Sequence, residues 1–245
     1  ISSDILGPLP PSIVHGFRYM LMFYDWLSGK CFLGYLKSRE SQAIKAAFLQ
    51  FKTDAQALLD AKGKGYVVEW HCDNDGSFTS PELDEMCSEL STRRTFSVAY
   101  ESDTNPGAER ALGVVIRPVR IMVAACGGES CWPYWPFFAN QVSLIHCQLP
   151  SRRFTPPMAP DTCLDIPINL KRFRVMCCRA YVRLPDITPD SKLSSPGVEA
   201  IHLGWDVQRE SFFVLIPYLN RITSVRTIRF AEREIVPLPA NLTPM

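Results

Sequence analysis

Three acidic residues stand where the surrounding chain gives no structural reason for a charge. Asp4 lies inside an apolar stretch, Asp73 ends a second apolar stretch, and Glu109 opens a long helical pattern. Carboxylates beside buried strands are costly unless they are paired or bound to metal. Converging carboxylate oxygens bind Mg²⁺ or Mn²⁺, and two such ions can activate a nucleophile on a phosphodiester. The three are therefore candidate catalytic and metal-binding residues, although each alone also suits a cap or a surface position.

The hydrophobic pattern predicts the elements that must position these carboxylates. Apolar runs bounded by turn residues predict strands, and apolar residues at intervals of three to four predict helices. The expected strands are 1–6, 17–23, 31–36, 66–70 and 95–100, followed in the tail by 175–184, 199–205, 212–216 and 222–230; the expected helices are 41–63, 81–90, 112–123 and 132–149. Pro118 lies inside the third helix, where it removes a backbone donor and predicts a kink.

Charge is distributed unevenly along the 245 residues, although the formal net charge is only +1. Residues 1–150 carry 13 basic and 16 acidic side chains, whereas residues 171–245 carry 11 basic and seven acidic ones. An acidic first part and a basic tail suit a protein that gathers carboxylates for a task and meets a polyanion. Ordinary scatter between two soluble domains explains the same numbers.

Composition excludes several protein classes. No apolar run reaches the roughly 18–20 residues that a membrane helix needs, so no membrane span is expected. The nine cysteines form no C-x-x-C pair and the four histidines are scattered, which disfavours a zinc site and favours reduced, buried thiols in an intracellular protein. The chain opens at Ile1 without a basic leader, as expected for a processed product or an excised domain.

The spacing of the acids resembles a known signature. Thirty-five residues separate Asp73 from Glu109, which is similar to the D,D-35-E pattern of retroviral and retrotransposon integrases. The flanking segments resemble the copia type over nearly the whole chain, from about residue 2 to residue 235. Segments that carry this resemblance include Ser3–Pro8, Cys72–Ser80, Asn105–Arg110, Gln148–Ser151, Cys178–Tyr181, Ile201–Trp205 and Val225–Glu232.

The resemblance implies a fold and a reaction. The implied fold is α/β: an RNase H-like core with a mixed five-stranded sheet and flanking helices over residues 1–149. A proline-rich linker over 150–170 and an SH3-like all-β domain with a C-terminal tail over 171–245 would follow. The implied reaction is phosphodiester cleavage and DNA strand transfer, with Asp4, Asp73 and Glu109 as ligands of two Mg²⁺ or Mn²⁺ ions.

The resemblance also implies partners. These are double-stranded DNA, as element ends and target, and further copies of the chain in a nuclear oligomer. Basic residues on the helix after Glu109 and at the start of the tail are the expected contacts to nucleic acid; the same charges also suit a solvated surface. These residues are Arg110, Arg117, Arg120, Lys171, Arg172 and Arg174.

Several residues near the acids depart from the family pattern. Asp75 replaces a glycine, Ser77 replaces a glutamate, and Pro106-Gly107 replaces Gly-Val, while Pro118 interrupts the helix that carries Glu109. These departures leave open an element-derived, non-enzymatic subunit of a larger assembly. An RNase H-type nuclease is disfavoured, because its usual fourth carboxylate is not evident and the tail fits the integrase pattern better.

Overall fold

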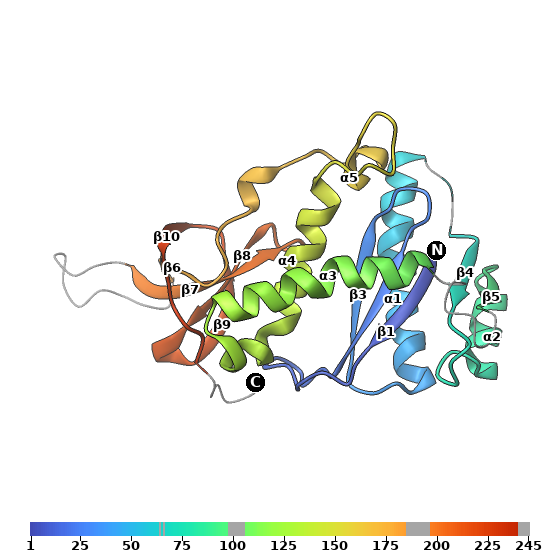
Figure 1. Cartoon of the computed structure of the whole chain (residues 1–245), viewed down its shortest axis with the longest axis horizontal. Helices are drawn as coiled ribbons and strands as arrows, with labels where there is room; N and C mark the ends of the chain where they lie inside the picture. The colour runs from blue at the N-terminus through green and yellow to red at the C-terminus, as the bar shows by residue number, and fades with distance from the viewer. Residues whose placement is uncertain (64, 66, 98–105, 185–196, 240–245) are drawn as a thin grey trace. The chain divides into compact units, whose positions relative to one another are not determined.

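A computed structural model describes residues 1–63, 65, 67–97, 106–184 and 197–239 (Figure 1). The chain divides into two compact units. The first unit contains residues 1–11, 15–117 and 142–169, and the second contains residues 12–14, 118–141 and 170–245. The two units are described separately below, because each has its own sheet and its own buried core.

The first unit is built on a mixed five-stranded sheet with the order β3-β2-β1-β4-β5. The central strand β1 runs antiparallel to β2 and parallel to β4, and β5 continues the parallel side. This arrangement confirms the predicted RNase H-like core. The strands are β1 (Ser2–Leu6), β2 (Tyr19–Tyr24), β3 (Cys31–Leu36), β4 (Glu69–Cys72) and β5 (Arg93–Phe96).

Helices accompany this sheet at nearly the places that the apolar pattern predicts. The longest, α1, ends where Gly63 adopts a left-handed φ of 61° and its N–H caps the last carbonyls, as a C-terminal glycine does. Pro81 occupies the first position of α2, where its missing N–H costs nothing. The helices are α1 (Ser41–Lys62), α2 (Pro81–Glu89), α3 (Pro106–Ala125), α4 (Trp135–Gln148) and α5 (Pro160–Cys163).

Aromatic side chains fill the core between α1 and the sheet. Phe48 of α1 stacks on Trp70 of β4 with ring centroids 4.1 Å apart, and Phe51 stacks on Phe23 of β2 at 4.4 Å. The indole N–H of Trp70 donates to the hydroxyl of Ser3 at 2.7 Å, a buried bond that joins β4 to β1. The two strands that carry the first two candidate aspartates are therefore fixed against each other.

Helix α3 remains one helix through Pro118. Its residues up to Arg117 belong to the first unit and those from Pro118 onward to the second. The candidate Glu109 and the two basic residues Arg110 and Arg117 consequently lie in the first unit, while Arg120 lies in the second.

Residues 150–169 also belong to the first unit. Ser151 and Met158 form a β-bridge, and α5 presents Asp161, which is only 2% exposed. Its carboxylate accepts hydrogen bonds from the ammonium of Lys30 and the side-chain amide of Gln148. The expected linker thus contains a buried ion pair, and the expected domain boundaries stay predictions.

The second unit contains an all-antiparallel five-stranded sheet with the order β10-β6-β7-β8-β9. It confirms a small all-β domain after the core, while the SH3-like assignment stays a prediction. The expected single strand 222–230 is wrong: the chain turns at Arg226 and Thr227, so that one half pairs with β8 and the other with β6. The strands are β6 (Cys178–Val182), β7 (Val198–Asp206), β8 (Ser211–Ile216), β9 (Arg221–Val225) and β10 (Ile228–Ile235).

Short 3-10 helices supplement these elements. The segment expected as one helix from Trp132 begins instead as a 3-10 helix, η2 (Gly128–Tyr134), with Pro133 inside it, and continues as α4. The others are η3 (Leu170–Arg172) and η4 (Pro217–Leu219). All nine cysteines are free thiols, and eight of them are buried. Within the described ranges, no helix is both long enough and apolar enough to cross a bilayer.

Candidate active site

Parallel pairing of β1 with β4 brings the first two candidate acids together. Ser2 pairs with His71, so the same register continued by two residues sets Asp4 beside Asp73. Asp4 is half-buried within β1, and its Oδ1 accepts a hydrogen bond from the backbone N–H of Ile5 at 2.7 Å. Asp73 directly follows β4 and is exposed. The two carboxylates come from adjacent strands of one sheet, as the sequence predicts.

Electrostatics link Asp4 to both other acids. The pKa of Asp4 is raised to about 6, mainly by burial and in smaller part by the negative charges of Asp73 and Glu109. The bond from Ile5 and the positive charge of Arg39 oppose that rise. Asp4 in β1 is thus near enough to Asp73, at the end of β4, and to Glu109, in α3, for both charges to raise its pKa.

Asp73 is held by groups at the ends of neighbouring strands. Its Oδ1 accepts hydrogen bonds from the hydroxyl of Ser97 and from the backbone N–H of Asn74, both at 2.8 Å. Ser97 is buried and follows β5, the next parallel strand, so its position is fixed by the sheet. Ser97 is not among the residues that the sequence pattern predicts for the site. A small polar residue at the end of a strand next to a candidate acid was the available signal.

Glu109 lies in the first turn of α3 and is exposed. A carboxylate at this end of a helix is stabilised by the helix dipole. Pro106 opens the helix, a position that suits proline because the first N–H has no partner within the helix. The sequence also predicts a polar loop over residues 101–107 before Glu109. Residues 101–105 lie outside the described residues, whereas Pro106 and Gly107 belong to α3 and not to a loop.

Across the described ranges, no three His, Cys, Asp or Glu side chains lie close enough together to hold a metal ion. The three carboxylates therefore do not form a preformed metal-binding site, although they influence one another electrostatically. The donor type nevertheless suits a hard divalent cation, since carboxylate oxygen is the ligand that Mg²⁺ and Mn²⁺ prefer. A cation at this place would also offset the charges of Asp73 and Glu109, which add to the effect of burial on the pKa of Asp4.

Arg39 neutralises one departure from the family pattern. The guanidinium of Arg39 donates to Oδ2 of Asp75 at 2.6 Å, and the backbone N–H of Ser77 donates to Oδ1 at 2.8 Å. The bond from Ser77 is the main cause that holds the pKa of Asp75 below its usual value. Asp75 thus adds a paired charge rather than an isolated one beside Asp73. The sequence analysis also missed Arg39, which is 36 residues away from its partner.

A second departure, Gly107, is explained by a close contact. A Cβ atom at position 107 would stand 2.9 Å from the ring of Trp26 and 3.2 Å from Tyr24. Trp26 lies in the turn after β2, so this turn packs directly on the first turn of α3. Only glycine admits this approach without displacing the indole.

The six predicted nucleic-acid contacts fall into two groups. Arg110 and Arg117 are exposed on the part of α3 that belongs to the first unit. The other four belong to the second unit, where Arg174 is ion-paired with Glu232 at 3.7 Å and lies over the ring of Phe230. These four are Arg120, Lys171, Arg172 and Arg174. The charge of Arg174 is therefore partly engaged within its own unit.

Comparison with known proteins agrees with this architecture. No protein-family model matches the chain. The chain is 23% identical over 244 residues to the retrovirus-related Pol polyprotein from transposon TNT 1-94 of Nicotiana tabacum. The match covers 96% of the chain but only 17% of the polyprotein, so the chain spans about a sixth of its curated relative.

Two solved structures align with the chain over most of its length. The simian T-cell lymphotropic virus intasome in complex with the PP2A regulatory subunit B56 gamma aligns over 97% of this chain and 77% of that one, with 13% identity and a TM-score of 0.53. The catalytic core of BIV integrase aligns over 66% of this chain and 90% of its own, with 14% identity and a TM-score of 0.46. The alignment to the intasome, together with the strand order β3-β2-β1-β4-β5, establishes an RNase H-like fold. The chain is thus similar in sequence to part of a transposon Pol polyprotein and in fold to a retroviral intasome chain, in agreement with the resemblance of its motifs.

Proposed function

We propose that the chain is an integrase-like polynucleotidyl transferase that acts on DNA. The observation that carries the proposal is the shared site of Asp4, Asp73 and Glu109, in which the pKa of Asp4 rises to about 6 partly through the other two charges. The similarity to a transposon Pol polyprotein supports the same class of reaction. Because the match spans only part of that polyprotein, the proposal concerns this segment alone.

In the proposed reaction a 3′-hydroxyl oxygen bonds to a phosphorus of target DNA while the bond from that phosphorus to its own 3′ oxygen breaks. The released oxygen takes up the proton, so the step exchanges one phosphodiester for another. Two Mg²⁺ or Mn²⁺ ions, held by Asp4, Asp73 and Glu109, would supply Lewis-acid stabilisation of the charge on the phosphate oxygens when bound.

Residues around the acids have positioning roles in this proposal. Ser97 orients the carboxylate of Asp73, and Arg39 compensates the charge of Asp75 and lowers the pKa of Asp4. Arg110 and Arg117, one and eight residues after Glu109, are exposed and suit contacts with DNA phosphates. The proposed partners are DNA ends and target DNA, together with further copies of the chain, and the proposed location is the nucleus.

A strand-transfer assay tests this function. The substrate is a labelled DNA end with a free 3′-hydroxyl, offered with target DNA in Mn²⁺ or Mg²⁺. We expect metal-dependent joining by the wild type and its loss in Asp73→Asn, while Asp54→Asn on the exposed face of α1 serves as the matched control. Absence of joining by the wild type in both metals would refute the proposal and favour the non-enzymatic subunit. Cleavage of an RNA strand paired to DNA, without joining, would favour the nuclease.

A further inference from the structure

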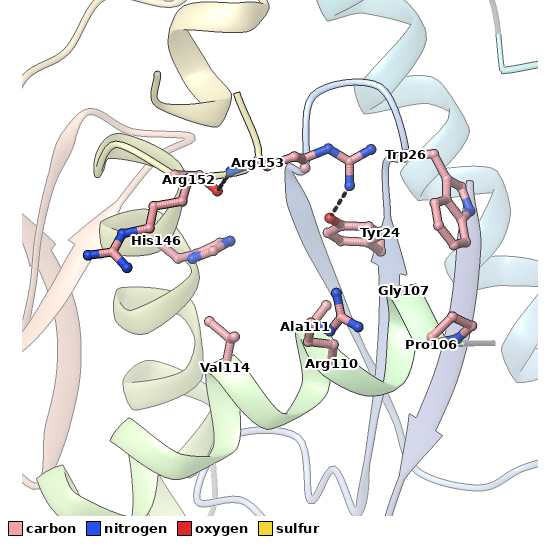
Figure 2. Close-up of a pocket in the computed structure, with 12 residues that line it drawn as sticks. Tyr24, Trp26, Pro106, Gly107, Arg110, Ala111, Val114, His146, Arg152 and Arg153 are labelled. Atoms are coloured by element: carbon pink, nitrogen blue, oxygen red, sulfur yellow. Dashed lines mark hydrogen bonds between the residues drawn. The ribbon is translucent and has the colours of Figure 1, made fainter. Parts of the chain in front are cut away.

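A groove lies in the first unit at the start of α3, the helix that carries Glu109. It encloses about 390 Å³ between the turn after β2, the start of α3 and the segment that follows α4. Figure 2 shows its walls, with Pro106, Gly107 and Arg110 on α3 and Arg152 and Arg153 on the opposite side. Its volume falls in the range of sites for small molecules or single monomers of a polymer. The carboxylates assigned to the reaction do not line it.

The charge of the groove is positive. Three arginines, Arg110, Arg152 and Arg153, line it together with His146, and none of the described lining residues is acidic. All three arginines are exposed. In the part of the chain that the structure describes, none of them is within ion-pair distance of a carboxylate. Three exposed guanidinium groups, none of them paired with a carboxylate of the described residues, make a favourable place for a phosphate, which accepts paired N–H bonds from arginine.

Aromatic rings form another part of the wall. The guanidinium of Arg153 donates to the hydroxyl of Tyr24 at 2.7 Å and lies 5.7 Å from the centre of that ring. Figure 2 shows Arg110 pointing from α3 toward the same tyrosine. Beside it, the indole of Trp26 meets Tyr24 edge to face at 5.9 Å and keeps 41% of its surface exposed. The close approach to Gly107 fixes the position of this exposed ring.

We propose that this groove binds an unpaired nucleotide of a DNA strand, with a phosphate between the arginines and the base against Trp26. Arginine and an exposed aromatic ring together are the usual means by which proteins hold single-stranded nucleic acid. The start of α3 adds the positive end of its dipole to the same site. The inference deepens the proposed function and rests on it for the identity of the polymer.

An acidic peptide from a partner protein is the competing ligand. Glutamate or aspartate side chains would satisfy the arginines, but they would leave the exposed face of Trp26 without a partner. A nucleotide satisfies both parts of the wall, because its base has a flat face that stacks on any aromatic ring. The combination of charge and ring therefore favours the nucleic acid.

Fluorescence anisotropy with a short labelled single-stranded oligodeoxynucleotide tests the inference. We expect Arg152→Ala/Arg153→Ala to weaken binding on the order of ten-fold and to reduce the salt slope by about 0.7, the value for one phosphate contact on a single strand. Trp26→Leu should weaken binding about ten-fold through lost stacking, with the salt slope unchanged. Arg93→Ala, on β5 and outside the groove, is the matched control and should bind as the wild type does. Circular dichroism of each variant checks that it is folded.

The outcomes separate this inference from the proposed function. Wild-type affinity in both groove variants overturns the inference, even if the chain joins DNA ends. Loss of affinity in both variants supports it, even if no joining occurs and the proposed reaction fails. Displacement of the probe by a glutamate peptide as readily as by unlabelled oligonucleotide would overturn it in favour of a protein partner. Equal displacement by a deoxynucleoside monophosphate or by inorganic phosphate would overturn the assignment to a strand.

Discussion

The ion pair between Lys30 and Asp161 predicts a large and specific loss of stability. Asp161 is 2% exposed and the side chain of Lys30 is 13% exposed, so both charges are largely removed from water. Gln148 donates to the same carboxylate. Replacing Lys30 by methionine keeps most of the apolar stem but leaves the buried carboxylate without the ammonium that pairs with it.

The expected magnitude follows from this burial. Removing one partner of a buried pair typically costs about 3–5 kcal/mol, because the remaining charge stays uncompensated. Lys30→Met should therefore lower the free energy of unfolding of the first unit by about that amount. The double variant Lys30→Met/Asp161→Asn removes both charges, keeps a polar group for Gln148 and should recover most of the loss.

Urea denaturation followed by tryptophan fluorescence measures these changes. The exposed pair of Lys45 and Glu82, 3.9 Å apart, provides the control, since Lys45→Met should cost less than about 1 kcal/mol. The prediction is wrong if Lys30→Met lowers the free energy of unfolding no more than Lys45→Met does. It is also wrong if the loss in the double variant equals the sum of the losses in the two single variants, because the two charges would then not be coupled. Lys30→Met should also weaken oligonucleotide binding, because α5 anchors the segment with Arg152 and Arg153.

Three further predictions concern the stability of the second unit at low pH, the turn after β2 and the candidate site. Burial lowers the pKa of His202 from 6.5 to about 4, so the unfolded chain binds the proton at a higher pH than the folded chain does. The second unit should therefore lose about 3 kcal/mol of stability as the pH falls from 6.5 to 4. Urea denaturation across that range should show a flatter dependence of stability on pH for His202→Gln, and an unchanged dependence would contradict the assignment. Gly107→Ala should give no net gain in stability when Trp26 is present, because the added methyl group meets the indole. In a Trp26→Ala background the same change should raise stability by about 0.5–1 kcal/mol. Equal effects on thermal denaturation in both backgrounds would contradict the contact. Ser97→Ala removes the hydroxyl that orients Asp73 and should weaken Mn²⁺ binding about ten-fold or more by calorimetry, whereas unchanged affinity would show that Asp73 needs no such partner.

Local patterns predict the helices and most strands of this chain. Residues 41–63 are recognisable as a helix because their apolar positions repeat along one face and a glycine ends them. The single strand expected over 222–230 fails, because a short apolar run does not reveal which neighbour each half will pair with. Strand pairing is a long-range property, and a turn at Arg226 and Thr227 carries no glycine or proline to announce it.

The candidate site shows the same division between local and long-range information. The spacing of Asp73 and Glu109 and the apolar strand around Asp4 identify three acids, since each sits in a recognisable element. Ser97 and Arg39 could not be identified in this way. They reach the site from distant parts of the chain, so only the completed sheet reveals what they contact.

These contacts change the meaning of the departures from the family pattern. Asp75 brings a negative charge toward Asp73, but Arg39 pairs with it, and the charge of Arg39 also lowers the pKa of Asp4. The substitution therefore adds an ion pair beside the acids instead of a bare repulsive charge. Loss of the Asp75 carboxylate alone would leave the Arg39 cation more available to Asp4, which lowers the pKa of that acid and keeps it ionised at a lower pH. Asp75 and Arg39 thus act on the candidate site together, because the cation that pairs with Asp75 is also the one that lowers the pKa of Asp4.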